Sequence, residues 1–211
     1  MKVKSPRVYK SVRRAQGTEQ TRTRIIAAAR ELLGGGKGLP SFSLDAVAKQ
    51  AGVTRLTVYN QFESKLGLLE AVFDDFAQRG GLLTDLPSVF VEPDPHVALR
   101  RFVSVFCHFW KVHEAMLPTF SAIAKLDDEF GQSLKERTER RRQVLTMLIK
   151  RLLPSTNPST AADLVDVLFT LTSFETYASL SVRNRSAKAI EELMYSLVEQ
   201  TVTGLGRIQV R

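Results

Sequence analysis

The chain has 211 residues, of which 44% are hydrophobic and 25% charged, the composition of an ordinary globular protein. Its single cysteine, Cys107, excludes an intramolecular disulfide and any metal site built from several cysteines. The sequence shows neither an apolar leader nor an apolar run of about 18 residues, so we expect a soluble, cytoplasmic protein without a membrane partner.

The net charge of +8 is distributed unevenly along the chain. Residues 1–62 carry twelve Lys or Arg against three acids, a net charge of +9, whereas the remainder sums to −1. This asymmetry is typical of an N-terminal segment that binds a polyanion and is attached to a neutral body. For residues 2–14 taken alone, a solvated basic tail is an equally simple interpretation.

The N-terminal part reads as a basic arm followed by four helices. Residues 1–17 lack apolar periodicity, and we expect a flexible arm there. Thr18 is the expected cap of a helix that the glycine run 34–38 ends. Three further helices are predicted over 44–51, 55–62 and 65–79, with Ser43 and Thr54 as caps and Gly52 as the left-handed residue that ends the first of them.

The rest of the chain also predicts helices alone, which makes the fold class all-α with about nine helices. Residues 82–95 contain three prolines and no periodicity, and we expect a domain boundary there. The predicted domains are therefore the arm 1–17, an N-terminal domain 18–81 and a C-terminal domain 82–211. In the last of these, helices are expected over 95–113, 118–126, 127–153, 160–182 and 186–204.

The stretch Ala51–Phe62 predicts a helix too short to be stable alone. Ala48 is small enough for a close crossing, Gly52 makes the tight turn, and Val53 and Val58 anchor the second helix from below. This is helix-turn-helix geometry, in which the second helix enters the DNA major groove. Any corner between two helices needs such an Ala and Gly, but the local charge and the polar outer face favour DNA binding.

The segment SLDAVAKQAGVTRLTVYNQFESKLGLLEAV resembles the DNA-binding domain of the TetR family of bacterial transcriptional regulators. The resemblance rests on the turn Gly52-Val53-Thr54, on Tyr59 and Phe62, and on Lys65 at the start of the next helix. It implies a ligand-responsive, sequence-specific regulator, most often a repressor, that binds a palindromic operator in double-stranded DNA as a homodimer. An architectural DNA-binding protein with little sequence preference is the alternative.

Eight residues are the candidate DNA contacts. The planar fork of Arg55 suits the two acceptors of a guanine, with a phosphate as the alternative partner, and Lys65 adds its charge to a helix N-terminus that favours anions. The pair Leu66-Gly67 departs from the family pattern, and we expect it to loosen the fourth helix. The full candidate set is Ser43, Thr54, Arg55, Leu56, Thr57, Tyr59, Asn60 and Lys65.

The resemblance also implies a small-molecule effector site and a dimer interface in the C-terminal domain. An aromatic stripe of this spacing is more often plain core, and Trp110 and Tyr177 are the better pocket candidates because each has a polar atom. The pocket candidates are Phe102, Phe106, Phe109, Trp110, Phe120, Met147, Phe174 and Tyr177. The interface candidates are Leu164, Leu168, Leu171, Glu175, Ala178, Ile190, Leu193, Met194, Leu197, Val198 and Val202, which a monomer would instead bury internally.

Other classes of function find little support in the sequence. His108 and His113 have no cysteine or acid pair at metal-binding spacing, so we expect neither a metal nor a cofactor. The familiar nucleophile, metalloprotease and nucleotide-loop motifs do not occur, so we expect no enzyme activity. The basic run 137–142 alternates with acids and is interpreted as a solvated helix face.

Overall fold

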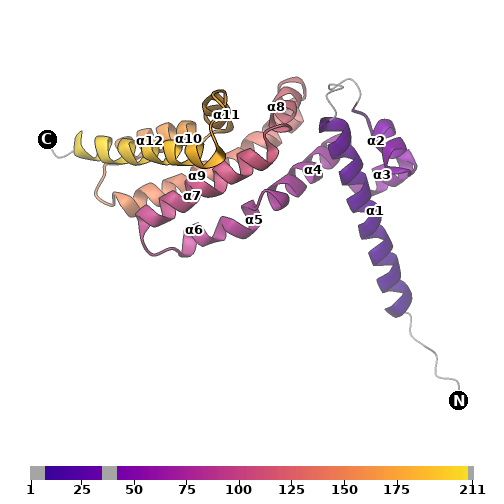
Figure 1. The fold of residues 1–211 in the computed structure, drawn as a ribbon. Coiled ribbons are helices and arrows are strands. Elements are labelled where there is room, and N and C mark those ends of the chain that lie inside the picture. The colour runs from indigo at the N-terminus through magenta and orange to yellow at the C-terminus, as the bar shows by residue number, and fades with distance from the viewer. Residues whose placement is uncertain (1–7, 35–41, 209–211) are drawn as a thin grey trace, which may run out of the picture. The chain divides into compact units, whose positions relative to one another are not determined.

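A computed structural model describes residues 8–34 and 42–208, with side chains described for 16–34 and 42–204. All regular structure in these ranges is helical, which confirms the all-α fold class (Figure 1). The chain divides into two compact units, Met1–Asp75 and Phe76–Arg211, and each is described by itself. The division lies inside a helix, and the domains 18–81 and 82–211 expected from the sequence stay predictions.

The N-terminal unit is built from three helices and the first part of a fourth. α1 packs against α2, and α2 against α3. The helices are α1 (Val8–Gly34), α2 (Leu44–Ala51), α3 (Arg55–Phe62) and α4 (Lys65–Arg79). Their apolar faces form a core in which Ile25, Val47, Val58, Leu68 and Val72 are fully buried.

The start of α1 differs from the sequence prediction. The helix begins at Val8, ten residues before the expected cap at Thr18, so residues 8–17 are helical and only 1–7 of the expected arm lie outside the described residues. Gly17 inside the helix costs about 1 kcal/mol relative to Ala, and extending a formed helix is easier than nucleating one. The glycine run beyond Gly34 also lies outside the described residues.

The predicted caps Ser43 and Thr54 and the predicted helix end at Gly52 are confirmed. The Ser43 hydroxyl accepts a hydrogen bond from the Ala46 amide at 3.1 Å, and Thr54 does the same for Thr57 at 3.1 Å. Gly52 has φ +64° and ends α2 in the left-handed conformation, which only glycine adopts without strain. These caps fix the tight turn between α2 and α3.

The C-terminal unit contains the end of α4 and eight further helices. The central α9 packs against α7, α8 and α10, and α12 lies along α7 and α10 (Figure 1). These helices are α5 (Leu82–Asp85), α6 (Pro87–Val91), α7 (Pro95–His113), α8 (Leu117–Leu126), α9 (Asp128–Leu152), α10 (Pro158–Leu171), α11 (Phe174–Ser181) and α12 (Ala187–Ile208).

Two parts of this unit differ from the expected helices. The segment 82–95, in which no helix was predicted, contains α5 and α6. Pro87 suits the first turn of α6, and the fully buried Val89 anchors that helix to the core. The helix expected over 160–182 breaks at Thr172. Ser173 caps α11 by accepting from the Thr176 amide at 3.2 Å, which starts a new helix there.

Candidate functional site

The short helix α3 is held in place by two of its own buried side chains and by one residue of α1. Val58 and Phe62 are buried. The Arg22 guanidinium of α1 donates a hydrogen bond to the Gln61 carbonyl at 2.9 Å and lies 4.4 Å from the centre of the Phe62 ring. Because both contacts end on α3, Arg22 clamps the helix that the sequence predicts to read DNA, a role that the helical pattern alone did not reveal.

The outer side of α3 is open to solvent. The side chains of Leu56 and Tyr59 are 66% and 55% exposed, which is unusual for large apolar and aromatic residues of a folded domain. Of the eight candidate DNA contacts, all but the half-buried Thr57 are exposed; these seven are Ser43, Thr54, Arg55, Leu56, Tyr59, Asn60 and Lys65. The buried side of α3 therefore fixes the helix while its outer side remains available to a partner.

Arg55 is oriented by an acid on the preceding helix. Its guanidinium donates to the Asp45 carboxylate at 3.1 Å, and both side chains are about two-thirds exposed, at 67% and 65%. The sequence analysis named Arg55 but not Asp45. Asp45 lies in the first turn of α2, where an acid also interacts favourably with the helix N-terminus.

The capping hydroxyls of the site retain a proton to donate. Ser43 and Thr54 each use the oxygen as an acceptor for a helix amide, which leaves the O–H of the group able to donate. Thr54 also shares a hydrogen bond of 2.8 Å with the Thr57 hydroxyl, in which either hydroxyl can be the donor, so the Thr54 proton is available to a phosphate when Thr57 donates. Phosphate oxygens accept such bonds in protein–DNA complexes, so these caps suit a backbone contact.

Lys65 begins α4 as predicted, and the loosening of this helix expected from Leu66-Gly67 stays a prediction. Ser64 caps the helix by accepting from the Gly67 amide at 2.9 Å. A Cβ at position 67 would collide with the carbonyl oxygen of Phe62, the last residue of α3. Glycine is therefore what lets α3 and α4 join in this tight turn, and it holds Lys65 close to the end of α3.

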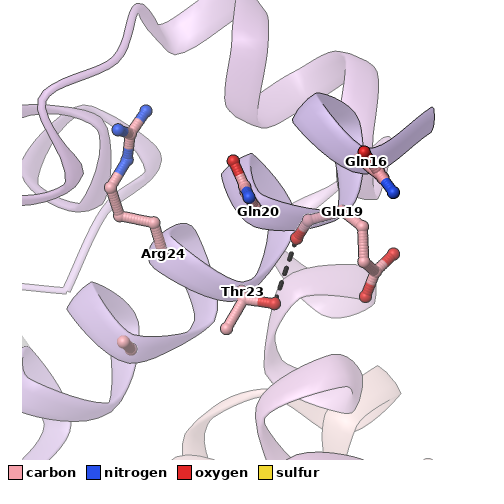
Figure 2. A pocket seen from close by; sticks show the side chains of 6 residues that line it. Gln16, Glu19, Gln20, Thr23 and Arg24 are labelled. Atoms are coloured by element: carbon pink, nitrogen blue, oxygen red, sulfur yellow. Dashed lines mark hydrogen bonds between the residues drawn. The ribbon is translucent and has the colours of Figure 1, made fainter. Parts of the chain in front are cut away.

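A hollow on α1 lies away from the predicted contacts. It is lined by Gln16, Glu19, Gln20, Thr23, Arg24 and Ala27, of which the first five are labelled in Figure 2. The Thr23 hydroxyl donates to the Glu19 carbonyl at 3.0 Å. All six residues belong to one helix, so the hollow is an open depression of the helix surface. None of its residues is a candidate contact, and we assign it no function.

In the C-terminal unit, four of the predicted pocket residues form a row of neighbouring rings that are tilted against one another. Ring centres are 4.8 Å apart for Phe102 and Phe106, 5.8 Å for Phe106 and Trp110, and 5.9 Å for Trp110 and Phe174. Trp110 donates its indole N–H to the Thr172 carbonyl at 3.1 Å, so its polar atom already has a partner within the chain. This bond lies at the break between α10 and α11.

The remaining pocket candidates continue from these four rings. The buried Phe109 has its ring centre 5.0 Å from those of both Trp110 and His113, and the ring centre of the buried Phe120 lies 5.1 Å from that of Phe76. Met147 and the buried Tyr177 belong to the main core of the unit. A pocket among the eight candidates stays a prediction.

The interpretation of residues 137–142 as a solvated face is wrong for Arg141. Its side chain is only 6% exposed, and its guanidinium donates to the Thr172 hydroxyl at 3.0 Å and lies 4.0 Å from the centre of the Phe169 ring. Burial lowers the pKa of Arg141 to about 10, which still leaves it cationic at neutral pH. The sequence does contain a sign of this burial: Arg141 lies three, four and seven residues before Val144, Leu145 and Leu148, which are buried on the same helix.

Six of the candidate interface residues are buried inside the single chain. Since they already pack in its core, they offer no apolar surface to a second copy; they are Leu164, Leu168, Ile190, Met194, Val198 and Val202. The physical reason is that α7 and α9 cover the inner faces of α10 and α12. The other five candidates, Leu171, Glu175, Ala178, Leu193 and Leu197, are partly or fully exposed.

Metal and membrane features complete the description. In residues 8–34 and 42–208, no group of three or more His, Cys, Asp or Glu side chains is placed to hold a metal ion. Among the same residues, every helix is too short or too polar to cross a bilayer.

Comparison with known proteins finds relatives of the N-terminal unit. Residues 25–72 match the sequence model of the bacterial regulatory proteins of the tetR family. The HTH-type transcriptional regulator EthR of Mycolicibacterium smegmatis is 31% identical over 108 residues, which are 51% of this chain and 49% of EthR. TtgW of Pseudomonas putida, an uncharacterized HTH-type transcriptional regulator, is 47% identical over 58 residues, 28% of this chain and 42% of TtgW. The chain thus spans about half or less of these relatives' length.

Solved structures share the fold over most of the chain. A transcriptional regulator from Rhodococcus sp. Rha1 has a TM-score of 0.65 at 18% identity, covering 87% of this chain and 96% of that one. A tetR-family transcriptional regulator from Streptomyces coelicolor has a TM-score of 0.57 at 24% identity, covering 89% and 83%. At these identities the likeness concerns the fold alone.

Proposed function

Because the chain belongs to the TetR family of bacterial transcriptional regulators, we propose that it binds an operator in double-stranded DNA sequence-specifically and represses transcription there. The observation that carries this proposal is the exposed outer side of α3 on a helix whose inner side is clamped by Val58, Phe62 and Arg22. The positive charge of residues 1–62 supplies the attraction to phosphate. This division into a fixed inner side and an open outer side suits a recognition helix.

In the proposed complex the exposed residues divide into two roles. Arg55 donates its two parallel N–H bonds to a guanine, and Leu56 packs against a thymine methyl. Tyr59 and Lys65 donate to phosphates on either side, and the Ser43 and Thr54 hydroxyls add further phosphate contacts. Base contacts then specify the sequence, while phosphate contacts set the position of α3 in the groove.

A homodimer is part of the same proposal. One recognition helix reads only a half-site, and two chains related by a two-fold axis read an inverted repeat with half-sites about 34–36 Å apart. Leu171, Leu193 and Leu197 are the partly exposed apolar residues on α10 and α12 that we expect at the interface. The six buried residues of these helices support it from within the chain.

The response to a small-molecule effector completes the proposed mechanism. A ligand that binds one conformer of the C-terminal unit better than another shifts the population toward that conformer. Repression is relieved when the favoured conformer no longer holds both recognition helices at the half-site spacing. The row of rings around Trp110 is the region in which we expect the ligand to bind.

Competition binding with the full-length protein tests the proposal. Labelled fragments of the source genome are incubated with the protein at physiological salt and a large excess of unrelated duplex. We expect a small set of fragments to stay bound, and the Arg55→Met variant to lose them while it folds normally. Equal loss of all fragments to competitor would instead indicate an architectural protein that binds DNA without sequence preference.

A further inference from the structure

A buried cation without a matching anion lies in the core of the C-terminal unit. Arg141 of α9 is 6% exposed, and the hydrogen bond to the Thr172 hydroxyl engages one of its three nitrogens. Its Nε is fully buried and makes no hydrogen bond. Among the described residues no carboxylate forms an ion pair with it; Glu175 acts on it only from a distance.

Such an arrangement is unfavourable unless something compensates it. A buried guanidinium carries five N–H donors, and each donor left unpaired away from water loses the hydrogen bonds that water would supply. Aromatic rings compensate in part, since the guanidinium lies 4.0 Å from the ring centre of Phe169, 5.8 Å from Phe106 and 5.9 Å from Trp110. Rings do not replace the missing acceptors.

The neighbouring Arg142 differs from Arg141 in having ion-pair partners. Arg142, the next residue, pairs with Asp166 of α10 and with Glu139 at 3.1 Å. It also lies over the Phe169 ring at 4.1 Å, so the two arginines share one aromatic neighbour while only Arg142 has acids. Asp166 and Glu139 are therefore committed to Arg142, and Arg141, on which Glu175 acts only from a distance, has no ion-pair partner among the described residues, so its fork is left for an acceptor from outside the chain.

We propose that Arg141 is the anion-binding group of the effector site and that the effector is an apolar organic acid whose carboxylate takes the guanidinium fork. A carboxylate matches the fork with two parallel hydrogen bonds, and the rings of Phe106, Trp110 and Phe169 suit an apolar body. Trp110 and Phe169 are partly exposed, so the site borders solvent. A dianionic phosphate would place two charges against one cation among apolar rings, which this site disfavours.

The position of the site gives the ligand a route to act on the fold. Thr172 accepts from the Arg141 guanidinium through its hydroxyl and from the Trp110 indole through its carbonyl. This residue joins α10 to α11. A carboxylate that takes the guanidinium away from Thr172 therefore loosens this junction. The effector role of the bound acid rests on the proposed function, whereas the anion site itself does not.

Fluorescence of the full-length protein tests the site, because Trp110 is the only tryptophan of the chain and lies beside Arg141. The probes are two pairs that differ only in charge: decanoate with decanamide, and phenylacetate with phenylacetamide. We expect a saturable change with at least one acid and at least tenfold weaker binding of its amide. Arg141→Met should remove this preference, and the exposed Arg140→Met should keep it.

A structural role for Arg141 predicts different results. If the residue only supports the fold, Arg141→Met lowers the Tm without ligand and leaves acid and amide equal in both proteins, which overturns the inference. The inference expects an unchanged or higher Tm, because a buried unpaired charge is removed. If Arg141→Met fails to fold, Arg141→Lys keeps the charge without the fork and should still weaken acid binding at least tenfold.

Release of DNA is measured separately with the same acids. Preference for the acid in a protein that binds no DNA specifically would contradict the proposed function and support the anion site. Specific DNA binding in a protein that responds equally to acid and amide, or to neither, would support the function and overturn the anion site.

Discussion

Arg55 of α3 and Asp45 of α2 form an ion pair of 3.1 Å across the turn of the helix-turn-helix. Because both side chains are about two-thirds exposed, the pair contributes little to folding, on the order of 0–1 kcal/mol. A carboxylate beside a phosphate-binding surface repels the DNA backbone and lowers affinity, so Asp45 must serve a purpose other than folding stability or affinity. We infer that Asp45 orients the guanidinium of Arg55 toward the bases.

Replacing Asp45 should separate affinity from specificity. Asp45→Asn removes a negative charge and releases Arg55, so we expect binding to unrelated duplex to become severalfold tighter while discrimination against a mismatched half-site falls by about 1 kcal/mol or more. Fluorescence anisotropy with matched and mismatched duplexes measures both quantities. The control is Glu31→Gln, which removes an exposed acid of α1 that is bonded to Gln50. Equal loss of discrimination in this control would contradict the orienting role of Asp45.

Lys65 should act through phosphate and not through sequence. Lys65→Gln is expected to weaken binding to all duplexes alike and to reduce the slope of log K against log salt by about 1, since one counterion fewer is released. A titration at several salt concentrations measures the slope. Lys188→Gln, the same loss of charge on α12, should leave it unchanged. A base-specific effect of Lys65→Gln would show that the side chain reads a base edge.

Two glycines of the N-terminal unit should respond oppositely to alanine. Gly67→Ala places a Cβ against the Phe62 carbonyl oxygen and should lower the free energy of unfolding by roughly 2 kcal/mol or more. Gly17→Ala meets open space inside α1 and should raise it by about 0.5–1 kcal/mol. Denaturant unfolding followed by circular dichroism measures both. Stabilisation by Gly67→Ala would mean that α3 and α4 join differently.

Cys107 should be inert in the folded protein. Burial raises the pKa of its thiol to about 12, so at pH 8 the thiolate is ~2000-fold rarer than in an unfolded chain of pKa about 8.5. A colorimetric thiol reagent should therefore react far more slowly with the native protein than in denaturant. Because the folded pKa is the higher one, this group's contribution to stability is complete below about pH 8.5 and is lost as pH rises toward 12. Rapid native labelling would contradict the buried position.

Local sequence rules predicted the helix-turn-helix well. Ser43, Thr54 and Gly52 act through hydrogen bonds and backbone angles within a few residues of themselves, so their roles can be read from the chain. The all-α fold class follows equally from apolar periodicity. The start of α1 was missed because Gly17 weakens a helix without ending it.

Long-range contacts were beyond the reach of these rules. Arg22 donates a hydrogen bond to a carbonyl 39 residues away in the sequence. Trp110 donates to Thr172, where α10 ends and α11 follows, and the local sequence did not predict this break. Apolar periodicity shows that a face is covered but not by what, which is why the inner faces of α10 and α12 were assigned to a partner chain. Within the described residues, α7 and α9 cover them instead.

Selection of bound duplexes from a random library at physiological salt tests the central claim most directly. The full-length protein is used, and the enriched sequences are compared with those selected by Arg55→Met. We expect an enriched inverted repeat whose half-sites are one or more helical turns apart, with at least one guanine position that the Arg55→Met variant no longer selects. Tight binding without any enriched sequence would contradict sequence-specific recognition by α3.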